Sequence, residues 1–135
     1  MSALTLNWWA ILAAVVANFA IGGLWYSPAL FVHPWMRMAG VDLKVFQAGF
    51  GRAIAVDVVS SIVIAMVLAV CLHVGGGHSL VSGLHAAFLL WLGFNATILI
   101  ASVTYEHRPF AFFAINAGYR LVSMLAMAAI LTLWK

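Results

Sequence analysis

Four long apolar stretches follow one another along this chain, and each is long enough to cross a lipid bilayer as an α-helix. The hydrocarbon core of a bilayer is about 30 Å thick, which a helix of about 20 residues spans. The stretches run from about Leu6 to Tyr26, from about Ala53 to His73, from about Leu80 to Thr104 and from about Phe110 to Trp134. They are continuously apolar and do not alternate with polar residues, so they predict helices and not the strands of a membrane barrel.

The amino-acid composition also indicates a membrane protein. Of its residues 67% are apolar and 7% charged, whereas a soluble domain carries about 25% charged residues. The six Lys and Arg residues are dispersed and form no basic cluster, so we expect no nucleic-acid partner. The sequence therefore predicts an all-α integral membrane protein whose main partner is the bilayer, with a single four-helix transmembrane domain over residues 1–135.

The distribution of basic residues predicts an orientation. The first stretch ends in bulky residues and lacks a basic leader, so we interpret it as a retained span and not as a cleaved signal peptide. Four spans place both termini on one side, with the first and third connections on the other. These two connections carry four cations against one at the termini, and the positive-inside rule makes them cytoplasmic and both termini external. The cations are Arg37, Lys44, Arg52 and Arg108 in the connections and Lys135 at the end.

The first connection is too long and too apolar for a plain loop. The sequence predicts a short helix over residues 34–39 that Gly40 ends, and Asp42 is placed to cap a second helical stretch. One face of that stretch would carry Leu43, Phe46 and Phe50. This pattern is typical of an interfacial, amphipathic helix on the membrane surface. The alternative is that the second spanning helix begins early, near Leu43.

Charged side chains within the spans are the strongest indication of a site, because a central Arg or Asp costs about 2.5–3.5 kcal/mol on insertion scales. Arg120 lies ten residues beyond Phe110, which is about 15 Å along a helix and near the middle of the bilayer. Asp57 lies five residues beyond Arg52, about 7–8 Å along the second span. We therefore expect Asp57 to be the partner of Arg120, with Glu106 as the second candidate.

Amides extend this pattern. Asn116 precedes Arg120 by four residues, so the two share one helix face. Asn18 and Asn95 lie within the first and third spans. We predict that these faces converge on one polar intramembrane cluster of Asp57, Asn95, Asn116, Arg120 and Asn18.

Two interpretations of this cluster stay open. In the structural one, Asp57 and Arg120 form an internal ion pair and the amides make hydrogen bonds between helices. In the functional one, the cluster lines a cavity for a proton, an ion or a small solute. Small residues also recur on the first span, where Ala10, Ala14, Asn18 and Gly22 follow one another at intervals of four. Such a face lets helices approach closely, within the bundle or between the subunits of a homo-oligomer.

The sequence offers little support for metal or enzyme chemistry. Cys71 is the one cysteine, so no disulfide framework exists. His73 and His78 flank a glycine turn but have no carboxylate beside them, which argues against a metal site. No serine, cysteine or histidine set has a recognisable nucleophile arrangement. We therefore expect no metal, no cofactor and no catalytic residues.

Two segments carry a resemblance to a known family. The first ends in Trp25-Tyr26-Ser27-Pro28, and the second contains Asn116-Ala117-Gly118-Tyr119-Arg120. Together they resemble the bacterial membrane family known as domain of unknown function 1761, and the resemblance covers essentially the whole chain. It implies a compact four-helix protein of the bacterial inner (plasma) membrane and brings no activity with it. It also directs attention to the interface residues Trp25, Tyr26, Ser27, Pro28 and Tyr119.

For function, the first hypothesis is a small transport- or channel-type protein that handles a proton, ion or small solute through the polar cluster. The alternative is a non-catalytic structural or accessory membrane subunit whose polar cluster only holds the bundle together. An enzyme is a distant third. Water discriminates between the first two, because a transport pathway needs a wet cavity and a scaffold needs a dry, fully paired centre.

Overall fold

In the part that the computed structural model describes, residues 7–27, 30–75 and 79–134, the chain folds as helices joined by short turns and contains no strand. Four helical segments are long and apolar enough to cross a membrane, and many of their large apolar side chains are exposed, which indicates contact with lipid. The segments are α1 (Trp8–Trp25), α4 (Phe50–Val74), the third span (Leu80–Thr104) and α8 (Phe110–Leu133). The all-α fold class is thus confirmed.

The third span is not one continuous α-helix. It consists of α5 (Leu80–Trp91), the π-helical turn η1 (Leu92–Ala96), α6 (Thr97–Leu99) and α7 (Ala101–Thr104). Ser79 begins α5 with a capping box, in which its hydroxyl accepts from the Ser82 amide while the Ser82 side chain bonds back to Ser79. The hydropathy pattern predicts the length of this span but contains no signal for its π-helical turn.

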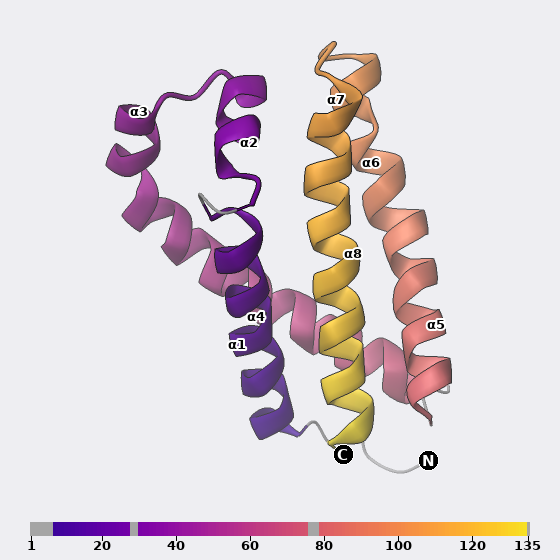
Figure 1. Ribbon diagram of the computed structural model, residues 1–135. Helices are drawn as coiled ribbons and strands as arrows, with labels where there is room; N and C mark the ends of the chain where they lie inside the picture. Colours follow the sequence, from indigo (N-terminus) through magenta and orange to yellow (C-terminus); the bar gives the residue numbers. More distant parts are fainter. Residues whose placement is uncertain (1–6, 28–29, 76–78, 135) are drawn as a thin grey trace.

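α8 lies between α1 and α5, and α4 runs obliquely behind α1 and α8 (Figure 1). The N-terminal end of α1 meets the C-terminal end of α8, where the Asn7 side-chain amide donates to the Trp134 carbonyl at 3.2 Å. Each of the four spans buries at least one alanine completely, and such small side chains let helix backbones approach one another. The fully buried alanines are Ala10, Ala14, Ala65, Ala87 and Ala128. The small-residue face of α1 is therefore used inside the bundle.

The first connection contains two short helices. α2 (Val32–Ala39) ends at Gly40, whose φ of 73° is in the left-handed region that favours glycine. α3 (Leu43–Ala48) begins at Asp42, whose carboxylate accepts from the Val45 amide at 2.8 Å. Both caps agree with the sequence prediction. Gly49 separates α3 from α4, so the second span does not begin at Leu43. The side chains of Leu43 and Phe46, on which the predicted apolar face depends, lie outside the described part.

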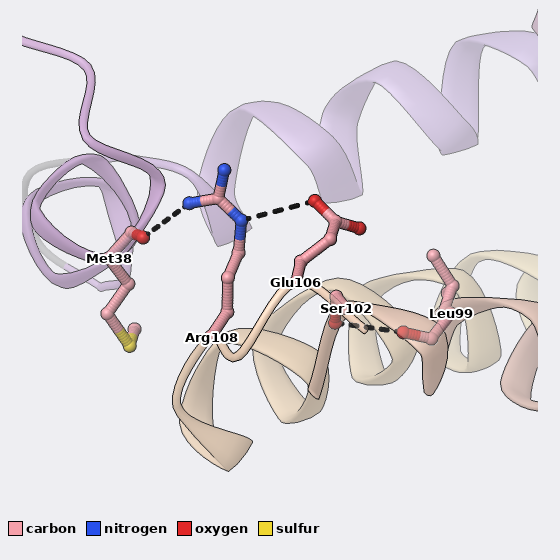
Figure 2. Close-up of polar contacts among 5 residues, drawn as sticks. All are labelled: Met38, Leu99, Ser102, Glu106 and Arg108. Carbon is pink, nitrogen blue, oxygen red and sulfur yellow. Dashed lines mark hydrogen bonds and ion pairs between the residues drawn. The ribbon is translucent and has the colours of Figure 1, made fainter. Parts of the chain in front are cut away.

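Arg108 connects α2 to the turn between α7 and α8 (Figure 2). Its guanidinium Nη1 donates to the carbonyl oxygen of Met38 at 2.7 Å, and its Nε lies 3.5 Å from a carboxylate oxygen of Glu106. The same guanidinium lies 5.0 Å from the centre of the Phe112 ring. α2, α3 and the α7–α8 turn consequently lie at one end of the bundle (Figure 1).

Close packing of α5 on α8 yields a stability prediction. A Cβ placed on Gly83 would collide with Cγ2 of Thr132, whose hydroxyl bonds to the Ala128 carbonyl at 2.8 Å and holds the side chain in place. A Cβ on Gly93 would meet nothing within 4 Å. Gly83→Ala should therefore lower the free energy of unfolding by about 1–3 kcal/mol. The matched control Gly93→Ala should leave it unchanged or raise it by up to about 1 kcal/mol. Denaturation with sodium dodecyl sulfate in mixed micelles measures both, and equal effects would contradict the packing described.

Candidate functional site

The amide of Asn18 lies at the centre of the bundle and is completely buried. Its Nδ2 donates to the Ser61 hydroxyl of α4 at 2.6 Å. Its Oδ1 accepts from the Tyr119 hydroxyl of α8 at 2.9 Å and also from the Ser123 hydroxyl one turn further along α8. One side chain of α1 thus connects α4 and α8. We call Asn18, Ser61, Tyr119 and Ser123 the Asn18 cluster.

The spacing of residues along α1 and α8 positions the side chains of the Asn18 cluster. Tyr119 and Ser123 are four residues apart and share one face of α8. Asn18 continues the small-residue face of α1, and Gly22 follows it by one turn. A Cβ on Gly22 would lie 3.0 Å from the Tyr119 hydroxyl oxygen, so the missing side chain leaves room for the phenol. The close approach at Gly22 therefore brings Tyr119 within reach of Asn18.

The Asn18 cluster is uncharged, and its hydrogen bonds are formed within the protein. Across the described residues, no buried side-chain nitrogen or oxygen lacks a hydrogen-bond partner. An amide and three hydroxyls can hold helices together in hydrocarbon, where each such bond contributes about 0.6 kcal/mol on average and up to about 1.7 kcal/mol. The cluster contains no carboxylate, histidine or cysteine, and no group of three or more His, Cys, Asp or Glu side chains occurs in the part of the chain that the structure describes.

A second set of contacts lies at the end of α1. The Trp25 indole donates to the Ile115 carbonyl at 2.9 Å, and the Tyr26 hydroxyl donates to Oδ1 of Asn116 at 2.7 Å. The Tyr26 and Tyr119 rings meet edge to face at 5.4 Å, so these contacts adjoin the Asn18 cluster.

These contacts account for most of the predicted interface residues. Trp25, Tyr26 and Tyr119 come together, whereas Ser27 bonds locally to the Leu24 carbonyl at 2.7 Å. Pro28 lies outside the described residues. The two segments that carry the family resemblance therefore contact each other.

Asn95 lies apart from the Asn18 cluster. It belongs to η1 and is half-buried, and its side-chain Nδ2 lies 3.4 Å from the Met124 sulfur. One residue before η1, the Trp91 indole donates to the Ala117 carbonyl of α8 at 2.8 Å. The polar contacts of the third span with α8 are thus the indole hydrogen bond of Trp91 and the weak amide–sulfur contact of Asn95. Neither residue belongs to the Asn18 cluster.

The expected ion pair between Asp57 and Arg120 does not form, since no Arg120 nitrogen lies within 4.0 Å of an Asp57 oxygen. The Arg120 guanidinium lies instead 5.0 Å from the centre of the Tyr119 ring. Glu106, the second candidate partner, contacts Arg108. Both Asp57 and Arg120 are half-buried. Counting residues gives the depth of a side chain but not its direction around the helix, and the prediction rested on depth alone.

Sequence reasoning missed Ser61, which completes the Asn18 cluster on α4. Its signal is the spacing of four residues from Asp57, which places both on one face of that helix. Ser123 was recognisable in the same way from Asn116 and Arg120, because the three recur on one stripe of α8. A serine in an apolar helix is a weak signal, because its hydroxyl can also bond to its own backbone.

The Asn18 cluster gives a second stability prediction. Asn18→Leu keeps the approximate size of the side chain but removes every bond to Ser61, Tyr119 and Ser123, so the free energy of unfolding should fall by about 2 kcal/mol. Asn95→Leu is the control, because it loses only the sulfur contact and should change stability by less than about 0.5 kcal/mol. Unfolding by sodium dodecyl sulfate in mixed micelles separates the two. An Asn18→Leu protein as stable as the wild type would rule out a structural role for the cluster.

Comparison with known proteins identifies the family of the chain. No curated protein and no solved structure matches the chain. A family model described as "Protein of unknown function (DUF1761)" matches residues 9–132, nearly the whole length. The match includes the end of α1, the Asn18 cluster and all of α8 except its final residue. The chain therefore belongs to the DUF1761 family.

Proposed function

We propose that this chain is a non-catalytic membrane subunit, with a structural or accessory role, whose polar centre holds its helices together. The observation that carries the proposal is the Asn18 cluster, in which one buried amide joins α1, α4 and α8. A transport pathway needs polar groups that exchange partners with water or solute. In the Asn18 cluster the amide and the hydroxyls bond to one another instead.

The proposal includes a location and an orientation. We place the protein in the bacterial inner membrane, with the α2–α3 connection and the α7–α8 turn in the cytoplasm and both termini outside. The two basic connections lie at one end of the bundle, which supports this orientation (Figure 1). α2 buries Val32 and Met36 and exposes His33 and Arg37, which suits a short helix at the membrane surface.

A small transport-type protein is the second candidate. It is favoured by Asp57 and Arg120, two charges within the spanning helices that form no ion pair with each other. Such residues often mark ion or proton pathways. Because both are half-buried and lie outside the Asn18 cluster, a pathway through them would run along the side of the polar centre.

Flux measurements on the purified protein in lipid vesicles test the proposal. The wild type should be no more permeable to protons and potassium ions than protein-free vesicles, and osmotic swelling in small neutral solutes should also be unchanged. Asp57→Asn and Arg120→Gln should behave like the wild type. A wild-type flux that Asp57→Asn abolishes, while the folded protein persists, would reject the structural proposal and favour transport.

A further inference from the structure

An open, shallow hollow of about 610 Å³ lies where the chain turns from α2 into α3 (Figure 1). His33 and Arg37 line it from α2, where they are one turn apart and share a face. Asp42 lines it from the N-cap position of α3, and the buried side chain of Met36 also borders it. The hollow therefore carries two groups that can bind an anion and one that can bind a cation.

The charged groups of the hollow are not paired with one another. Arg37 and Asp42 both line it, yet among the described residues neither takes part in an ion pair. One carboxylate oxygen of Asp42 accepts from the Val45 amide, and the other accepts no hydrogen bond from a described residue. The side chains of His33 and Arg37 likewise donate to no residue of the described chain. These groups are thus free to bind a ligand of the right charge.

The packing of α2 on α8 places the hollow at the boundary between membrane and water. The ring of Trp35 stacks on that of Phe112, with 6.5 Å between their centres. Phe112 is the third residue of α8, a helix long and apolar enough to span the bilayer. Arg108, just before α8, donates to the Met38 carbonyl at the other end of α2. A tryptophan at the end of a spanning helix is typical of the lipid headgroup region, so headgroups lie at the level of the hollow.

Charge complementarity identifies the ligand. A simple anion would suit Arg37 but would be repelled by Asp42, and a simple cation would be repelled by Arg37. A group that carries both a phosphate and a primary ammonium satisfies both residues through charge-assisted hydrogen bonds. We infer that the hollow binds the phosphoethanolamine headgroup of a phospholipid. Arg37 and His33 donate to the phosphate oxygens, which the imidazole N–H can do even when the ring is neutral, and the ammonium donates to Asp42.

The position of the hollow favours a lipid over a soluble molecule with the same groups. A dissolved ligand loses translational freedom when it binds, and an open hollow offers it few contacts in return. The bilayer already holds lipid headgroups at this level. The connection that forms the hollow also exposes the apolar side chains of Leu30 and Val45, which suits adjoining acyl chains. The inference goes beyond the proposed structural role and holds whichever side of the membrane this end of the bundle faces.

Native mass spectrometry of the purified protein tests the inference, with equal amounts of phosphatidylethanolamine and phosphatidylglycerol that have identical acyl chains. The wild type should retain phosphatidylethanolamine in preference. Asp42→Asn keeps a good helix cap but removes the charge, so it should weaken phosphatidylethanolamine binding about tenfold, as the loss of one charge-assisted hydrogen bond does. Arg37→Gln should weaken the binding of both lipids. Lys44→Gln makes the same change of charge at an exposed position outside the hollow and should have no effect.

Two further probes in the same experiment examine the ammonium and the acyl chains. Phosphatidylcholine, whose quaternary ammonium has no N–H to donate, should bind more weakly than phosphatidylethanolamine. Soluble phosphoethanolamine at the concentration of the lipid should not displace it. A preference for phosphatidylglycerol or an equal affinity for phosphatidylcholine would overturn the inference. So would unchanged lipid selectivity in Asp42→Asn, equal losses in Arg37→Gln and Lys44→Gln, or displacement by phosphoethanolamine. None of these results bears on the flux test of the structural proposal.

Discussion

In hydrocarbon there is no water to satisfy an amide, so a buried asparagine must find its partners in the protein. Asn18 finds three of them on two neighbouring helices, and the arrangement of the bundle follows from that requirement. α4 must bring Ser61 to the amide nitrogen, and α8 must bring Tyr119 to the carbonyl oxygen. Because lipid is as apolar as a leucine side chain, such bonds and close packing replace the hydrophobic effect as the force between helices.

The position of Tyr119 then influences the next set of contacts. Its ring occupies the space that Gly22 leaves open and contacts the ring of Tyr26. Tyr26 in turn bonds to Asn116, and Trp25 to the backbone beside it. The aromatic end of α1 is therefore coupled to the Asn18 cluster. The segments that carry the family resemblance are the two sides of this one contact.

The spans and the helix caps could be predicted from the sequence, but the rotation of each helix about its axis relative to its neighbours could not. Uninterrupted apolar length identified the four spans, and the caps at Gly40 and Asp42 followed from backbone and side-chain chemistry that acts within a few residues. The partner of Arg120 depends instead on how α4 and α8 are turned about their axes and on the oblique path of α4. Those quantities arise from packing between residues far apart in the sequence. Ser61 was missed for a related reason, since its spacing of four residues from Asp57 does not distinguish it from a serine that bonds to its own helix.

The polar residues of the spans thus fall into two groups with different chemistry. The Asn18 cluster is neutral, buried and internally bonded, which suits a structural role. Asp57 and Arg120 are charged, half-buried and not paired with each other, which suits contact with something outside the chain. A function that depends on charge would therefore reside in the second group, while the first maintains the geometry on which it depends.

Because the polar groups of the Asn18 cluster bond to one another, water should not reach them in the folded protein. Thiol accessibility tests this most directly, with Ser61→Cys in a Cys71→Ser background and a small water-soluble methanethiosulfonate as the probe. Arg52→Cys, at an exposed position near the start of α4, is the matched control. We predict that Cys at position 61 stays unmodified in the folded protein over the time in which Cys at position 52 reacts completely. Modification of both at similar rates would mean that water reaches the cluster, and would contradict the account.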